Sequence, residues 1–313
     1  MTDEVDLRPS RSEAPTVSVI VPVHNDAERL GRCLRLLAQQ DYPRDRFEVV
    51  VVDNASTEDL RPALPPGDER FRVEHEARRG SYAARNKGVV SSEGDVLAFT
   101  DGDCLPRPGW LSAGVEALTR APAPDAVGGA INLVFRGGRE PRSAPEHMDA
   151  MEGLPQEHSI ATYPFAMTAN LLVRRETFDR VGPFDAGLKS GGDLDWGLRL
   201  DATGGSFRYA ADAVVDHPSR PTWGELTHKS VRVAGGVADL EANRPAREVL
   251  RGVGGELWDA LAFWKVVWTL DRPRRWTSRV ALAAAFGYVR VLRSGVRLSR
   301  LVRRGRGRCR AGG

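Results

Sequence analysis

Residues 17–25 read VSVIVPVHN, a continuous run of apolar and mainly β-branched residues that ends in a polar pair. Such a run is typical of a strand buried on both faces of a parallel sheet. Leucines and Cys33 then recur at helical spacing from Asp26 to Gln40, and Tyr42-Pro43 ends the pattern. The stretch therefore predicts a strand followed by a helix, which is how α/β folds begin.

The same alternation continues along the chain. Strands are predicted at 48–52, 71–75, 95–100, 126–135 and 168–174, and helices at 81–90 with Ser81 as N-cap, from Pro108 onward, and at 193–202. Residues 136–157 are rich in Gly, Pro and charge, and predict a long loop, with at most one helical turn, that closes over a site. The rhythm favours a largely parallel sheet covered by helices, with ligands at the carboxyl ends of the strands.

Three regions are expected: a flexible leader at 1–15, an α/β domain at 16–223 and a helical region at 224–313. The leader lacks the apolar run of a signal peptide, and the sequence offers no apolar run of the roughly 18 residues that a spanning helix needs. Three scattered cysteines, Cys33, Cys104 and Cys309, argue against a disulfide framework and a zinc cluster. A cytoplasmic location is expected.

The charge is unevenly distributed. The net charge is +3, but residues 271–313 hold thirteen arginines against one acid, so the remainder is acidic. Five of these arginines recur at steps of three and four and form one helical stripe: Arg290, Arg293, Arg297, Arg300 and Arg304. The stripe predicts either docking on an anionic membrane, aided by upstream tryptophans, or packing against the acidic body. Nucleic-acid binding is disfavoured because the stretch lacks interleaved aromatics.

The sequence Asp101-Gly102-Asp103 directly follows a predicted strand. Two carboxylates so placed suit one hard divalent cation, Mg²⁺ or Mn²⁺, bound to a diphosphate. Asp and Gly are also favoured in ordinary turns, so a simple turn is the alternative.

Five segments in order strengthen the metal interpretation: VSVIVPVHN (17–25), VVVVDNAS (49–56), GSYAARNKG (80–88), FTDGDC (99–104) and GPFDAGLKSGGDLDWGLRL (182–200). Together they resemble the family 2 glycosyltransferases of the GT-A fold, from about Val17 to His217. The resemblance implies a nucleotide-diphosphate-sugar donor, UDP-linked by preference, an acceptor hydroxyl, a divalent metal and transfer with inversion.

The resemblance also implies roles for donor-side residues. Pro22 and His24 would touch the nucleotide and Asp53 would accept the imide N–H of its base. His24 could instead be a strand-end polar residue, and Asp53 could form an Asx-turn with the residues that follow it. Arg85, near a helix N-terminus, would contact the donor, although an ordinary surface helix is the alternative. Asp101 would approach the ribose or the sugar.

Two ligands are implied for the metal, Asp103 and His217, although a lone histidine is more often a packed structural residue. Asp193 matches the general base of the family's acidic motif, in which Gly192 here replaces the first acid. We expect Asp193 to be the N-cap of a helix beginning at Leu194, which would keep its carboxylate ionised. Asp195 is the competing base. Asp179 and Asp185 are interpreted as turn residues without a catalytic role.

Other functional classes fit less well. A nicotinamide dehydrogenase needs a Gly-x-Gly-x-x-Gly run after the first strand, where this chain has PVHN at 22–25. A sugar-nucleotide pyrophosphorylase would also need a Gly-rich phosphate loop there. A non-catalytic nucleotide-sugar-binding scaffold is the remaining alternative; the Gly192 replacement favours it, and the three retained aspartates at 101, 103 and 193 oppose it.

Overall fold

The computed structural model describes residues 14–138, 140–242 and 244–311, so most of the predicted leader lies outside the described residues. The chain divides into two compact units. Unit 1 comprises the residues up to 132 with 155–186 and 193–216, and unit 2 comprises 133–154, 187–192 and the residues from 217 onward.

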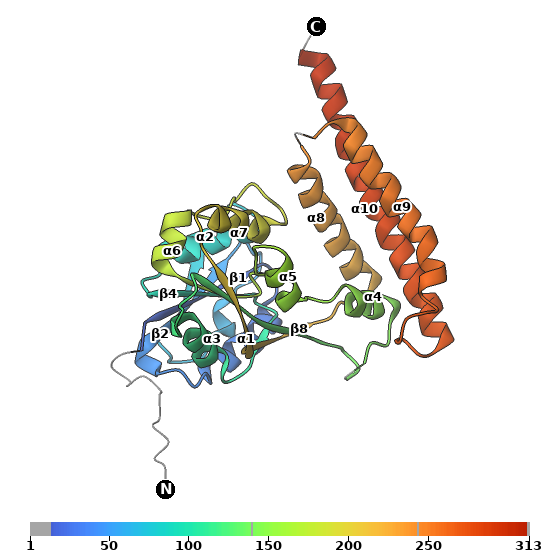
Figure 1. The fold of residues 1–313 in the computed structure, drawn as a ribbon. Helices are drawn as coiled ribbons and strands as arrows, with labels where there is room; N and C mark the ends of the chain where they lie inside the picture. Colours follow the sequence, from blue (N-terminus) through green and yellow to red (C-terminus); the bar gives the residue numbers. More distant parts are fainter. Residues whose placement is uncertain (1–13, 139, 243, 312–313) are drawn as a thin grey trace. The chain divides into compact units, whose positions relative to one another are not determined.

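Unit 1 contains a mixed sheet whose N-terminal half is parallel. Its four strands are β1 (Val17–Val23), β2 (Phe47–Asp53), β3 (Phe71–His75) and β4 (Val96–Thr100). They lie in the order β3-β2-β1-β4, and every neighbouring pair is parallel. The predicted strands of this half are confirmed (Figure 1).

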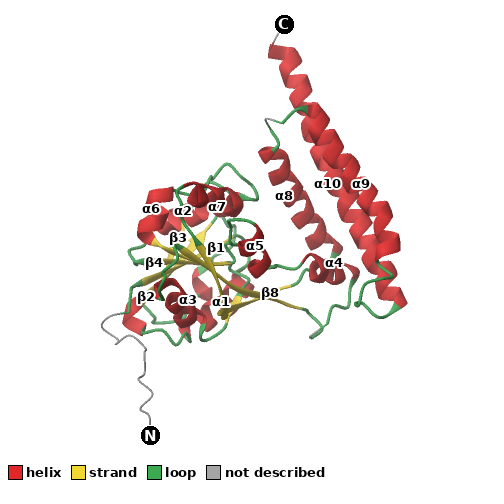
Figure 2. Ribbon diagram, in the orientation of Figure 1, coloured by secondary structure: helices red, strands yellow, loops and turns green. Residues whose placement is uncertain are grey.

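Helices cover both faces of this sheet (Figure 2). One face carries α1 (Ala27–Ala38) and α3 (Trp110–Thr119), whose buried side chains join the core formed by the valines of β1 and β2. The other carries α2 (Ser81–Val90), α6 (Arg175–Val181) and α7 (Gly192–Ala202). The shorter elements are η1 (Arg44–Arg46), η2 (Arg61–Ala63) and α5 (Gln156–Thr162).

The rest of the sheet contains antiparallel pairs. The order continues with β7 (Asn170–Arg174), β6 (Ala126–Val134), β8 (Phe207–Pro218) and the short β5 (Leu105–Pro106). β7 runs antiparallel to both β4 and β6, and β5 runs antiparallel to β8. The predicted α/β class is confirmed, whereas β8 has no counterpart among the predicted elements.

Unit 2 is built on four helices: α4 (Ala144–Glu152), α8 (Trp223–Leu240), α9 (Ala246–Val266) and α10 (Trp276–Ala311). Their buried side chains form a second core around Met148, Phe263 and Phe286. The predicted helical character of the C-terminal region is confirmed. Within the described residues, none of these helices has the length and apolarity to span a bilayer.

The predicted long loop at 136–157 is wrong, because it contains helix α4. Ser143 accepts a hydrogen bond from the Glu146 amide, and the Glu146 carboxylate accepts one from the Ser143 amide, which is a capping box. Pro145 stands in the first turn, where its missing N–H costs nothing.

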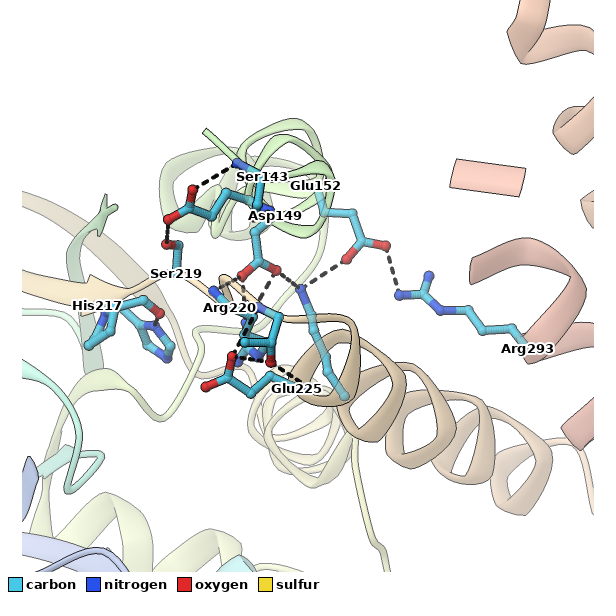
Figure 3. A network of polar contacts seen from close by, with 12 residues as sticks. Ser143, Asp149, Glu152, His217, Ser219, Arg220, Glu225 and Arg293 are labelled. Atoms are coloured by element: carbon cyan, nitrogen blue, oxygen red, sulfur yellow. Dashed lines mark hydrogen bonds and ion pairs between the residues drawn. The ribbon is translucent and has the colours of Figure 1, made fainter. Parts of the chain in front are cut away.

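Buried ion pairs hold α4 in unit 2 (Figure 3). Asp149, 1% exposed, pairs with Arg220 and with Lys229 of α8, and Glu152 pairs with Lys229 and with Arg293 of α10. Desolvation acts to raise the pKa of Asp149, but the two cations outweigh it and the pKa lies below its usual value. A helix fixed in this way does not suit the predicted role of a closing loop.

The arginine stripe of α10 faces acids of its own unit. Arg297 pairs with Glu241 and Glu256, and Arg300 pairs with Asp239. Arg293 is engaged with Glu152, Arg304 donates to a backbone carbonyl, and Arg290 lies over the Phe286 ring. Four of the five arginines therefore have a hydrogen-bond or ion-pair partner within unit 2, which favours the packing interpretation.

Candidate active site

The carboxyl ends of β1, β2 and β4 lie side by side in unit 1. A Cβ placed on Gly102 would lie 3.3 Å from the Pro22 carbonyl oxygen, so the turn after β4 packs directly on the end of β1. Pro22 is tolerated in this central strand because the pairing with β4 ends at Ile20, before the proline. His24 follows as an exposed residue.

Asp53 ends β2 opposite Val23. Its Oδ1 accepts the Ser56 amide at 2.9 Å, which is the contact that the Asx-turn alternative expected, and its Oδ2 lies 3.3 Å from His75 Nδ1. Partial burial acts to raise the pKa of Asp53, but hydrogen bonds from Ser56 and the neighbouring His75 bring it below the ordinary value. The carboxylate is thus ionised and held by a turn, which also suits an acceptor for a base N–H.

Two asparagines that the sequence analysis did not single out organise these strand ends. Asn25, at φ 51°, accepts the Thr57 amide at 2.7 Å and so joins the loops after β1 and β2. Buried Asn54 donates to the Arg78 carbonyl and accepts the Gly80 amide at 2.7 Å. The sequence signal that could have identified them is an asparagine at the end of a predicted strand, in His24-Asn25 and Asp53-Asn54.

Asn54 also fixes the start of α2. The predicted N-cap Ser81 is wrong: the cap is Gly80, at φ 138°, and no side chain caps the helix. Glycine reaches this φ without the strain that a Cβ would add. The first-turn amides of α2 are thus uncapped by a side chain, an arrangement that attracts anions.

Arg85 of α2 lies beneath this surface, with its side chain 4% exposed. It forms an ion pair with Asp101 and its guanidinium lies 5.6 Å from the centre of the Tyr82 ring. Its Nε is buried without a hydrogen-bond partner. The structure therefore joins two predicted donor-side residues, and places Arg85 where it orients the Asp101 carboxylate.

Asp103 lies on the same turn as Asp101. One ligand atom each of Asp101, Asp103 and Cys104 lie within 4.8 Å of one another. Carboxylate oxygens are the ligands that Mg²⁺ and Mn²⁺ prefer, so the two aspartates have the right donor chemistry for a hard cation. Burial and both carboxylates raise the pKa of Cys104 well above its ordinary value, which keeps it a neutral thiol.

His217 follows Asp216, the residue of β8 that pairs with Leu105, and it is the first residue of unit 2 in that strand. It is buried, and its Nδ1 lies 2.8 Å from the Pro218 carbonyl oxygen (Figure 3). A carbonyl oxygen only accepts, so Nδ1 is the donor in this contact. An imidazole with its single proton on Nδ1 would present the Nε2 lone pair to a ligand. This is the tautomer that a metal-ligating histidine needs.

Asp193 is the second residue of α7, which begins at Gly192, so the prediction that Asp193 is the N-cap of a helix starting at Leu194 is wrong. Its Oδ1 accepts the Leu194 amide at 3.1 Å and the Tyr82 hydroxyl at 3.3 Å. Desolvation raises the pKa of Asp193, although the charge of Arg85 and these hydrogen bonds oppose it. A raised pKa makes a carboxylate a stronger base, which suits proton abstraction.

This shift has a consequence for stability. The folded pKa of Asp193 lies above the unfolded value, so ionisation costs folding free energy above about pH 4 and the cost vanishes below it. We expect Asp193→Asn to stabilise the protein at neutral pH by about 1 kcal/mol, or about 2–4 °C in Tm. Thermal unfolding from pH 4 to pH 8 measures this.

Asp195→Asn is the matched control for that measurement, because the Asp195 carboxylate is paired with Arg199 at 3.1 Å. Its loss should leave Tm unchanged or lower it. A Tm of Asp193→Asn that is below the wild-type value at pH 7 would contradict the assigned pKa shift. The same ion pair argues that Asp195 is the weaker candidate for the base.

An aromatic cluster fixes α7 above the sheet. Trp196 stacks on Phe178 with ring centres 5.7 Å apart and donates to the Gly182 carbonyl, and Phe184 contacts both rings and Tyr82. Asp193, the candidate base, and Tyr82 are therefore next to packed aromatic rings. Of the residues interpreted as turns, Asp179 lies instead in α6.

Comparison with known proteins agrees with this geometry. Residues 18–184 match the family model described as glycosyl transferase family 2. The chain is 37% identical over 272 residues to glycosyltransferase AglE of Haloferax volcanii, covering 86% of each chain. The chain belongs to glycosyltransferase family 2, and it is a glycosyltransferase enzyme, which removes the non-catalytic scaffold alternative.

More distant relatives share part of their length with it. The chain is 27% identical over 249 residues to the pre-mycofactocin glycosyltransferase of Mycobacterium tuberculosis, covering 76% of this chain and 50% of that protein. Among solved structures, a mannosyltransferase from Pyrobaculum calidifontis in complex with GDP-Man and Mn²⁺ superimposes with a TM-score of 0.58 at 23% identity, covering 95% of this chain and 77% of the other. This likeness supports the GT-A-like fold.

Proposed function

We propose that the protein transfers a sugar from a UDP-sugar to an acceptor hydroxyl with inversion, and that Asp193 is the general base. The observation that carries the proposal is a continuous set of contacts in unit 1. Asp193 bonds to the Tyr82 hydroxyl, Arg85 lies over the Tyr82 ring, and Arg85 pairs with Asp101. These contacts connect the base to the carboxylate assigned to the donor side.

In this mechanism the Asp193 carboxylate removes the acceptor hydroxyl proton as the oxygen attacks the anomeric carbon. Tyr82 and the Leu194 amide orient that carboxylate. Arg85 holds Asp101 against the ribose or the sugar. The nucleoside diphosphate leaves from the opposite face, and no covalent enzyme intermediate is required.

The nucleotide occupies the ends of β1 and β2. Asp53, held by Ser56, accepts the base N–H, and the exposed His24 and the Pro22 backbone border the base. The uncapped amides at the start of α2 face the negative charge of the donor.

Asp103 and His217 are the proposed metal ligands. A divalent ion bound there would neutralise charge that develops on the leaving diphosphate. The oxygen-rich turn of Asp101 and Asp103 fits Mn²⁺ or Mg²⁺, and solved relatives of this fold bind Mn²⁺. A cytoplasmic location is part of the proposal, in keeping with the free, buried Cys33 and Cys104.

The test is a thermal-shift screen of UDP, GDP and dTDP with and without Mn²⁺, followed by donor-dependent release of the nucleoside diphosphate in the presence of acceptors. A ligand at 100 times its Kd stabilises the folded state by about 2.7 kcal/mol. We expect UDP with Mn²⁺ to give the largest shift. A larger shift with GDP would refute the uridine assignment, and an absence of any shift with all three would refute the nucleotide site.

A further inference from the structure

Unit 2 contains a cavity of about 1140 Å³ beside the connection between α9 and α10. Its lining is mixed, and it includes Glu140 and His147 besides apolar residues and arginines. Met151, Leu270 and Leu282 supply an apolar surface, and four arginines stand among them: Arg142, Arg272, Arg274 and Arg275. An apolar cavity lined by several guanidinium groups suits a ligand that joins an anionic head to an apolar chain.

The arginines of this cavity differ from those of the α10 stripe. Arg272 lies 3.4 Å from Glu140 in a pair that is about three-quarters exposed on both sides, so it is weakly engaged. The guanidinium groups of Arg142, Arg274 and Arg275 have no ion pair or hydrogen bond to any of the described residues. They are exposed and available to an external anion.

The Arg142 side chain lies against Gly137. A Cβ at Gly137 would lie 2.4 Å from the Arg142 side chain, so the missing side chain at 137 leaves room for the guanidinium to lie along the cavity wall. Guanidinium groups bind phosphate through paired N–H donors, and carboxylates and phosphates are the anions that this geometry matches.

Exposed tryptophans flank the same connection. Trp264, Trp268 and Trp276 are 44%, 50% and 69% exposed, which is unusual for side chains of this size. An indole ring with one polar N–H on an apolar body is favoured at the interface between lipid and water. Tryptophan and arginine side by side on one helical hairpin have the composition of a surface that lies on a bilayer.

We propose that this cavity binds the phosphate headgroup of an anionic membrane lipid, and that the α9–α10 connection is the surface by which unit 2 docks on a membrane. The phosphate pairs with Arg142, Arg274 and Arg275, while the tryptophans enter the headgroup layer. This site is separate in its residues from the proposed transfer site, so either could fail without the other.

The experiment is co-sedimentation of the full chain with vesicles of phosphatidylcholine, with and without phosphatidic acid. We compare the wild type with Arg274→Gln/Arg275→Gln. Two basic residues at about 1 kcal/mol each predict about 30-fold weaker binding to anionic vesicles. Arg247→Gln/Arg251→Gln removes the same charge from exposed positions of α9, about 22 Å or more along the helix from its C-terminal end, and should bind like the wild type.

Equal losses in the two double variants would mean diffuse attraction of charge and would overturn the proposal. Equal binding of the wild type to neutral and anionic vesicles would do the same. Inorganic pyrophosphate distinguishes the two sources of phosphate. Displacement of vesicle-bound wild-type protein supports a shared headgroup site. A pyrophosphate-induced rise in Tm that Arg274→Gln/Arg275→Gln abolishes, without vesicle binding, would assign the cavity to a free anion and refute the lipid.

Discussion

Asp193→Asn is expected to abolish sugar transfer, lowering kcat by about 10²–10⁴-fold, while UDP binding stays near normal. Asparagine keeps the size of the side chain and an oxygen able to accept from Tyr82 and Leu194, but it cannot take a proton. Release of nucleoside diphosphate measures kcat, and calorimetric titration with UDP measures binding. A fall in kcat of this size without a change in the Kd for UDP would show that Asp193 acts in the chemical step and not in nucleotide binding.

Tyr82→Phe separates orientation from proton transfer in the same assay. It removes the hydroxyl that donates to Asp193 but keeps the ring that lies beside Arg85 and Phe184. A smaller loss than that of Asp193→Asn is expected, with an altered pH profile. Near-normal turnover of Asp193→Asn, together with inactivity of Asp195→Asn, would move the base to Asp195.

Asp103→Ala is expected to weaken donor binding and to remove its dependence on Mn²⁺. The carboxylate would bridge the protein to a metal-bound diphosphate, and the loss of such stabilisation costs several kcal/mol, or at least about 100-fold in kcat/KM. Titration of UDP with and without Mn²⁺ gives the first result and initial rates give the second.

Asp179→Ala is the matched control, because it removes the same charge from an exposed position of α6 and has no proposed role. It should keep the metal dependence. If a chelator leaves UDP binding by the wild-type protein unchanged, the metal assignment of Asp103 is wrong.

Secondary structure was predicted most accurately where the local residue pattern matches the burial of the segment in the fold. Val17–Val23 and Phe71–His75 were predicted to the residue. For Val17–Val23 the reason is that an apolar, mainly β-branched run needs burial on both faces to be stable. Helix α4 was missed because its composition is that of a loop, although the Ser143–Glu146 capping pair was present. β8 was missed because the segment AADAVVD at 210–216 has no regular apolar–polar alternation and few large apolar residues.

At the site, the residues could be predicted but their contacts could not. Spacing placed Asp53 and Asp101 at strand ends, and the structure confirms both positions. The pairing of Arg85 with Asp101 and the bond between Tyr82 and Asp193 join segments far apart in the chain, and such pairs depend on how helices pack on the sheet. The sequence also gave no sign that burial raises the pKa of Asp193, since the helix start alone argued for the opposite direction.

The strand order has a consequence for how the chain is made. All four parallel strands lie within the first hundred residues, but the outer edge of β4 pairs only with β7, at Asn170–Arg174. During synthesis from the N-terminus, that edge stays open until β7 emerges, and an unpaired edge is where chains aggregate. Strand β5, Leu105 and Pro106, follows the two aspartates and pairs with β8, which is synthesised later still. A nascent chain arrested after β4 would therefore expose this edge, whereas in one arrested after β8 the edge can be paired with β7.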